Sequence, residues 1–168
     1  MIFLTVGTQF SFDRLVKAVD ELVEANGLDE KIFAQIGNST YRPKNFEATS
    51  ELEKSVFDEH FNRADGIISH AGMGTISMAM ERRKPLLVMP RLSKYGEVVN
   101  DHQVAISRKF EELHYLLVAY DQTDLSVKIE ELKTFTPKER RPQIEHVIAR
   151  ISTFLNELSG SEKQSTKR

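Results

Sequence analysis

The sequence contains no cysteine. This absence excludes disulfide bonds, thiolate metal ligands and cysteine nucleophiles from any account of its function. An excess of charge of one sign is also lacking, because 23 Lys and Arg residues stand against 25 Asp and Glu residues, giving a formal net charge of -2. No global positive field is available to attract nucleic acid or an anionic membrane surface. We expect no nucleic-acid partner and a cytoplasmic location.

Long hydrophobic runs are missing as well. The apolar start from Met1 to Val6 is short, has no basic leader and runs directly into Gly7. It therefore predicts a buried first strand rather than a signal peptide. No window approaches the roughly 20 apolar residues that cross a bilayer. Any association with the cytoplasmic membrane should be peripheral and come through a partner protein.

The composition that remains is that of an ordinary globular protein. The chain has 168 residues, of which 40% are hydrophobic and 29% are charged. This length and balance predict one domain with a substantial core. We place that domain at residues 1–158. Residues 159–168 contain no large apolar side chain and are expected to form a disordered polar tail.

Apolar runs typical of buried strands alternate with segments of helical periodicity. The first helix is expected from Ser11, as its N-cap, to a stop at Asn26-Gly27. The expected strands are residues 2–6, 31–37, 46–49, 66–69, 86–89 and 115–120. The alternation predicts an α/β fold with a Rossmann-like, doubly wound parallel sheet.

A long amphipathic helix is expected near the C-terminus, introduced by Arg141-Pro142. Its apolar face would comprise Ile144, Val147, Ile148, Ile151, Leu155 and Leu158. Two interpretations remain open for this face. It packs on its own domain, or part of it binds a partner.

Ligands of open parallel sheets bind beyond the carboxyl ends of the strands, where loops lead into helices. Residues 7–9, 69–75 and 90–103 follow expected strands there. Gly72 and Gly74 allow close backbone approach, and a helix opened by Thr75 would present free amides to a phosphate. A glycine pair at such a turn is also a common packing device, so both interpretations stay open.

Other ligand classes are poorly supported. The segment lacks the lysine of a P-loop and the third glycine of the dinucleotide fingerprint, which disfavours ATP hydrolysis and NAD chemistry. His70 and His102 are far apart and neither has a ligand at metal-binding spacing, so no metal is expected. Glu97, His102 and Gln103 either contact a sugar at the mouth of the crevice or are solvated residues at a helix start.

Three segments together resemble a known family. Residues 69–75 (Ser-His-Ala-Gly-Met-Gly-Thr), residues 84–90 (Lys-Pro-Leu-Leu-Val-Met-Pro) and Asp101-His102-Gln103 are similar to the donor-binding half of family 28 glycosyltransferases. Residues 3–8 and 12–16 are more similar to its small stand-alone members. These are the soluble subunits of two-component transferases, namely the eukaryotic dolichol-linked N-acetylglucosaminyltransferase and bacterial relatives in capsule and exopolysaccharide synthesis.

The resemblance implies a site for a UDP-sugar without a cofactor or metal. Its expected donor-binding residues are Gly7, Thr8, Ser69, His70, Gly72, Met73, Gly74, Thr75, Glu97, His102 and Gln103. The pattern departs from that of the large family members at Met78, where they carry an acidic residue for the ribose hydroxyls. The resemblance does not assign the catalytic base.

The implied activity is transfer of a hexosyl group, with inversion, from UDP to a lipid-linked saccharide acceptor. A membrane-associated subunit would bind the acceptor and complete the enzyme. Two alternatives remain. The chain is a non-catalytic stabilising subunit of such a transferase, or it is a stand-alone sugar-nucleotide-binding protein using His70, Glu97, Asp101 and His102.

Overall fold

The computed structural model describes residues 1–25, 28, 30–140, 148–154 and 156. The strands are β1 (Ile2–Thr5), β2 (Ile32–Gln35), β3 (Glu47–Thr49), β4 (Gly66–His70), β5 (Leu86–Met89) and β6 (Leu117–Val118). The α-helices are α1 (Asp13–Glu24), α2 (Lys54–Arg63), α3 (Met73–Arg82), α4 (His102–Glu112) and α5 (Leu125–Thr134). Two short 3-10 helices are η1 (Ser93–Tyr95) and η2 (Gln122–Asp124).

The six strands form one parallel sheet in the order β3-β2-β1-β4-β5-β6. The chain builds outward from β1 to β3, then returns to the other side of β1 and builds outward again through β4 to β6. The predicted doubly wound, Rossmann-like sheet is therefore confirmed. The order reverses between β1 and β4, and a crevice is expected beyond the carboxyl ends of those two strands.

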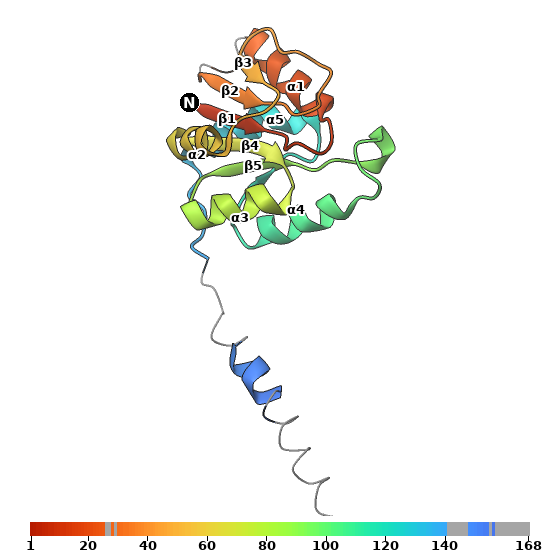
Figure 1. Cartoon of the computed structure of the whole chain (residues 1–168). Helices are drawn as coiled ribbons and strands as arrows, with labels where there is room; N and C mark the ends of the chain where they lie inside the picture. The colour runs from red at the N-terminus through yellow and green to blue at the C-terminus, as the bar shows by residue number, and fades with distance from the viewer. Residues whose placement is uncertain (26–27, 29, 141–147, 155, 157–168) are drawn as a thin grey trace, which may run out of the picture.

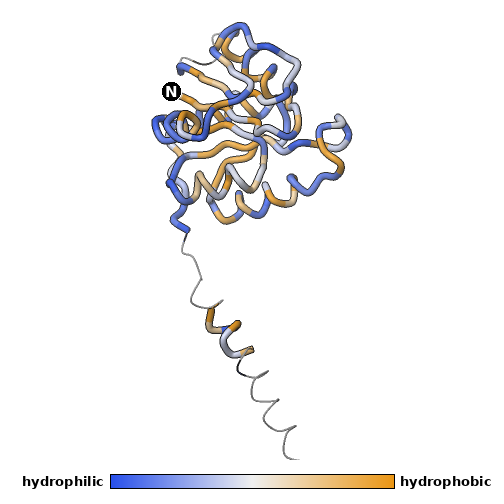
Figure 2. The backbone as a smooth tube through the Cα atoms, viewed as in Figure 1, coloured by the Kyte–Doolittle hydropathy of each residue, from blue (hydrophilic) through white to orange (hydrophobic). Residues whose placement is uncertain are grey.

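Side chains of alternating residues along each strand supply two cores, one on each face of the sheet. In β1, Ile2 and Leu4 belong to the core that also contains residues of α1 and α5, whereas Phe3 belongs to the core under α2, α3 and α4. Figure 1 shows α3 and α4 together on one face of the sheet. In Figure 2 the strands are largely hydrophobic, as expected for a sheet covered on both faces.

Two predicted helix starts are wrong. The N-cap of α1 is Phe12 rather than Ser11, and the side chain of Phe12 makes no capping hydrogen bond. The Asp13 carboxylate instead accepts from the backbone N–H of Thr40 at 2.8 Å, so a partner distant in sequence defines the helix start. Helix α3 begins at Met73, two residues before Thr75. The expected stop at Asn26-Gly27 lies outside the described residues.

The predicted C-terminal helix is described only in part, because residues 141–147, 155 and 157–168 lie outside the described residues. Residues 148–154 are helical. Three of their apolar side chains are more than half exposed: Ile148, Ile151 and Phe154. For these residues, the interpretation that the apolar face packs on its own domain is not supported.

Candidate functional site

A crevice of about 380 Å³ opens beyond the carboxyl ends of β1 and β4, at the reversal of strand order. Its lining consists of Val6, Gly7, Thr8, Gln9, His70, Gly72, Met73, Gly74, Thr75 and Arg91. The first four residues follow β1, the next five span the end of β4 and the start of α3, and the last follows β5. Three loops that are far apart in sequence thus converge on one site.

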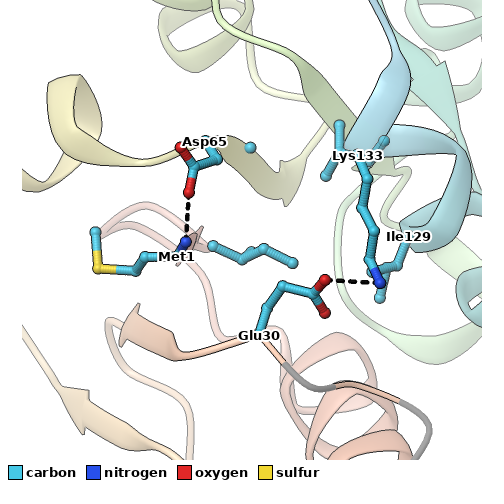
Figure 3. A pocket seen from close by; sticks show the side chains of 8 residues that line it. Met1, Glu30, Asp65, Ile129 and Lys133 are labelled. Carbon is cyan, nitrogen blue, oxygen red and sulfur yellow. Dashed lines mark hydrogen bonds and ion pairs between the residues drawn. The ribbon is translucent and has the colours of Figure 1, made fainter.

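A smaller pocket of about 240 Å³ lies at the opposite, amino end of the sheet, near Ile2 and Gly66. Figure 3 shows that its charged groups are paired with each other. The Met1 ammonium group contacts Asp65, and the Lys133 ammonium group contacts Glu30 at 2.6 Å. Because open parallel sheets place their ligand sites at carboxyl ends, the larger crevice is the candidate functional site.

The amino end of α3 supplies hydrogen-bond donors to the crevice. The first helical hydrogen bond runs from the Ile76 N–H to the Gly72 carbonyl at 3.1 Å. The amides of Met73, Gly74 and Thr75 therefore have no partner within the helix. Free amides and the positive end of the helix dipole favour an anion, and all three residues line the crevice.

The glycines around the crevice have different roles. A Cβ at Gly72 would lie 2.2 Å from Nε2 of His70, and one at Gly7, where φ is +72°, would lie 3.1 Å from Cε1 of the same ring. These two glycines make room for the histidine. A Cβ at Gly74 would meet no atom within 4 Å. Packing thus explains Gly72, whereas Gly74 borders open space where a ligand's phosphate could approach the backbone.

His70 is a neutral side chain on the floor of the crevice. Burial, together with the positive charge of Arg91, lowers the pKa of His70 to about 4. The Ser69 hydroxyl donates to the Thr5 carbonyl at 2.7 Å and lies 3.3 Å from Nδ1 of His70. Because the hydroxyl proton is already donated to Thr5, the hydroxyl oxygen can only accept from Nδ1. Nδ1 is therefore assigned as the protonated ring nitrogen. Nε2 is left as a hydrogen-bond acceptor.

Arg91 is one of three crevice residues missing from the predicted donor-binding set, with Val6 and Gln9, and it is the charged one. Only 3% of its surface is exposed, and Nη2 donates to the Val6 and Phe10 carbonyls at 2.7 and 2.6 Å. Burial lowers the pKa of its guanidinium to about 10, so the group remains charged at neutral pH. Its place directly after Pro90, at the carboxyl end of a buried strand, is the signal that could have identified it.

Glu97 lies outside the crevice lining and holds its own loop in place. Its carboxylate accepts from Nε and Nη2 of Arg14 at 2.8 and 2.9 Å, and from the backbone N–H of Leu92 at 2.9 Å. Arg14 also donates to the Pro90 carbonyl at 3.0 Å. These contacts connect α1 to the loop between β5 and α4, which projects from the body in Figure 1.

The other predicted residues also lie outside the crevice lining. Gln103 is buried and accepts from the Arg91 N–H at 3.0 Å, so it supports the residue that lines the crevice. Ser69 is buried beneath His70. His102 is exposed and contacts Asn100. The structure thus gathers seven of the eleven predicted residues in the lining: Gly7, Thr8, His70, Gly72, Met73, Gly74 and Thr75.

Among the described residues, no three His, Asp or Glu side chains are grouped so that they could hold a metal ion. Over the same part of the chain, no helix has the length and apolar character needed to traverse a membrane.

Comparisons of the sequence with family models and with known proteins agree on one family. The model of the glycosyltransferase family 28 C-terminal domain matches residues 1–155. The chain is 32% identical over 124 residues to UDP-N-acetylglucosamine transferase subunit ALG13 from Homo sapiens, and equally to that from Mus musculus. Each alignment covers 68% of this chain and 10% of the relative. The chain therefore spans about a tenth of the length of these relatives.

Comparisons of the structure give the same fold at lower identity. The solution structure of ALG13 superposes with a TM-score of 0.58 and 20% identity, covering 87% of this chain and 93% of that one. The glycosyltransferase of kitacinnamycin superposes with a TM-score of 0.58 and 19% identity, covering 79% of this chain and 34% of that one. MurG from Acinetobacter baumannii superposes with a TM-score of 0.51 and 19% identity, covering 78% of this chain and 38% of that one. These neighbours are GT-B glycosyltransferase domains, and their likeness shows the fold alone.

Proposed function

The chain belongs to the glycosyltransferase family 28 C-terminal domain family, and on that premise we propose that it is the donor-binding subunit of a two-subunit glycosyltransferase. It binds a UDP-sugar in the carboxyl-end crevice and contributes to hexosyl transfer, with inversion, onto a lipid-linked saccharide in capsule or exopolysaccharide synthesis. The observation that carries this proposal is the crevice itself, which is lined both by the residues of the three free amides at the start of α3 and by the Gly7-Thr8 turn.

The composition of the crevice supports the proposal of a partner subunit. The described crevice is open to solvent on one side and offers no carboxylate in its lining to act as a base. A second, membrane-associated protein would bind the acceptor and supply the missing groups.

The exposed apolar residues of the C-terminal segment are the proposed contact with that partner. Ile148, Ile151 and Phe154 are 57%, 53% and 58% exposed. Apolar side chains grouped at helical spacing and left in water are typical of interaction surfaces. Replacing all three with serine should abolish assembly, whereas Val127→Ser on α5, which is 70% exposed, should not.

The alternative of a non-catalytic stabilising subunit is favoured by one observation. Met78, at the position where the large family members carry a ribose-binding acid, packs against the core under α3. The stand-alone enzyme is disfavoured, because Glu97 is paired with Arg14, Asp101 accepts from the Ser93 N–H and His102 is exposed. These side chains do not form a catalytic group with His70 in the structure.

Titration of the isolated chain with UDP, followed by calorimetry, tests the proposal. Binding in the micromolar to millimolar range is expected, and Thr75→Ala should weaken it because that side chain lines the crevice. Membranes from cells that lack the chain should then regain transfer of labelled sugar from UDP when the purified chain is added back. Transfer that is restored by a chain unable to bind UDP would favour the stabilising subunit.

A further inference from the structure

Arg91 carries a buried positive charge without a counter-charge. Its side chain is almost fully enclosed, yet within the described ranges no Asp or Glu oxygen forms an ion pair with it. The nearest acidic influence is Glu97, and that carboxylate is occupied by Arg14. A buried charge that lacks an ionic partner is costly, and proteins rarely retain one without a use for it.

The guanidinium is held in a fixed position by the walls of the crevice. Nη2 binds the carbonyls of Val6 and Phe10, the two ends of the turn that contains Gly7 and Thr8. The group also lies over the Phe12 ring, with its central carbon 5.0 Å from the ring centroid. Arg91 therefore holds the turn after β1 against the end of β5.

Part of the guanidinium remains available. In the described portion of the chain, Nε is enclosed by protein atoms and has no acceptor, and Nη2 makes the hydrogen bonds to the turn. Nη1 is neither enclosed nor hydrogen-bonded there, so it is the nitrogen that a ligand in the crevice can reach. The residue lines the crevice, and none of the ten lining residues is acidic. Together with the free amides of α3, the crevice is biased towards an anion.

We propose that Arg91 supplies the positive charge that binds the diphosphate of the donor and, through its contacts to Val6 and Phe10, couples that binding to the position of the Gly7-Thr8 turn. This inference rests on the proposed function for the identity of the anion. Arginine suits both tasks, because one terminal nitrogen can hold the turn while the other faces a phosphate. Arg91 is a binding residue and takes no part in proton transfer.

The experiment compares pyrophosphate, UDP and uridine as probes of the unmodified chain and of Arg91→Gln. The glutamine keeps an amide donor for a turn carbonyl but removes the charge. This variant should bind pyrophosphate and UDP about 30-fold more weakly than the unmodified chain, equivalent to about 2 kcal/mol. Its affinity for uridine should stay within about twofold of the original. Lys94→Met is the matched control, since it removes a charge from the same loop at an exposed position and should change no affinity by more than about twofold.

Arg91→Lys sharpens the test and replaces the glutamine variant if that one fails to fold. It keeps the charge on a single nitrogen, so its pyrophosphate affinity should fall below that of the unmodified chain while uridine affinity is unchanged. Thermal unfolding of each variant without ligand checks that the fold is intact. An affinity equal to that of Arg91→Gln would show that charge is not the relevant property and would overturn the proposal. Where Arg91→Gln does not fold, a pyrophosphate affinity of Arg91→Lys equal to that of the unmodified chain would overturn it.

The outcomes separate this proposal from the proposed function. If Arg91→Gln binds pyrophosphate and UDP as the unmodified chain does, the role of Arg91 is wrong and the donor site stands. If pyrophosphate binds through Arg91 but UDP binds no more tightly than pyrophosphate and uridine does not bind, the nucleotide assignment fails and the role of Arg91 stands. If the unmodified chain binds none of the three, both are wrong.

Discussion

The two ends of the parallel sheet differ in how their charges are partnered. At the amino end, the Met1 ammonium pairs with Asp65 and Lys133 pairs with Glu30. At the carboxyl end, a buried guanidinium has no carboxylate partner among the described residues, and a helix presents free amides. Both ends contain a pocket.

This difference favours the carboxyl end as the functional end more clearly than pocket shape does. The charges of the amino-end pocket are paired with each other, although Oε2 of Glu30 is buried without a hydrogen-bond donor. The unpartnered donors over the crevice would gain free energy when an anion binds. Substitutions at the carboxyl end should therefore change ligand affinity, in some cases with little change in stability. Substitutions at the amino end should leave ligand affinity unchanged.

The largest expected effect on stability is the pH dependence caused by His70. The pKa of His70 is about 4 in the folded chain, whereas its ordinary value, expected in the unfolded chain, is 6.5. The unfolded chain therefore binds this proton first as the pH falls. Stability should therefore be lost from about pH 6.5 to about pH 4, by about 3 kcal/mol. Urea unfolding of the unmodified chain and of His70→Gln across that range measures this, and the glutamine variant should lose less.

His102→Gln is the matched control for the pH series. Its side chain is exposed beside Asn100 and lies outside the crevice lining, so this variant should follow the unmodified chain. Parallel profiles for the unmodified chain and His70→Gln would contradict a half-buried, neutral histidine on the floor of the crevice.

The next largest effect is expected at Gly72. In Gly72→Ala the new Cβ would lie 2.2 Å from the His70 ring, so the ring or the backbone must shift. Forced rearrangements of this kind cost about 1–3 kcal/mol. Denaturant unfolding should show that loss. The double variant Gly72→Ala with His70→Ala should recover part of it, and no recovery would place the strain elsewhere.

Gly74→Ala should change stability by less than about 1 kcal/mol, because its Cβ meets no protein atom within 4 Å and alanine is the better helix former. UDP affinity should nevertheless fall, since the added methyl group occupies the space that a phosphate would use. Calorimetric titration with UDP and with uridine measures this. Unchanged UDP affinity would mean that the phosphate does not approach this backbone.

The smallest effect is expected at the amino end. Lys133→Met breaks the contacts with Glu30 and Glu130 at the edge of the smaller pocket. Partly exposed ion pairs contribute little, so the loss of stability should be smaller than for Gly72→Ala, and UDP affinity should be unchanged. Lower UDP affinity in this variant would break the distinction between the two ends.

Most of the fold could be predicted from the sequence because its strands are continuous apolar runs. The predicted run at residues 86–89 is β5, and Phe46 to Thr49 contains β3. Helix starts were less predictable, because they depend on partners distant in sequence. Asp13 at the start of α1 is held by the Thr40 amide, a contact that no local rule for Ser11 anticipates.

The glycine-rich part of the crevice was predictable because the residues that line it there are neighbours in the sequence. Residues 72–75 form the turn and the first turn of α3 together. Arg91 was not predictable in this way, since its role arises from carbonyls more than 80 positions earlier in the chain. Glu97 and Gln103 were chosen as polar residues near a helix start, but their side chains bind Arg14 and the Arg91 amide. Polarity alone does not show which way a side chain points.

The most direct test of the account is to map UDP binding on the backbone amides of the isolated chain by NMR. We predict chemical-shift changes concentrated at Gly7, Thr8, His70, Arg91 and residues 72–75, with none at Ile2, Glu30 or Lys133. Changes centred on the amino-end pocket, or no change at millimolar UDP, would contradict the assignment of the carboxyl-end crevice as the donor site.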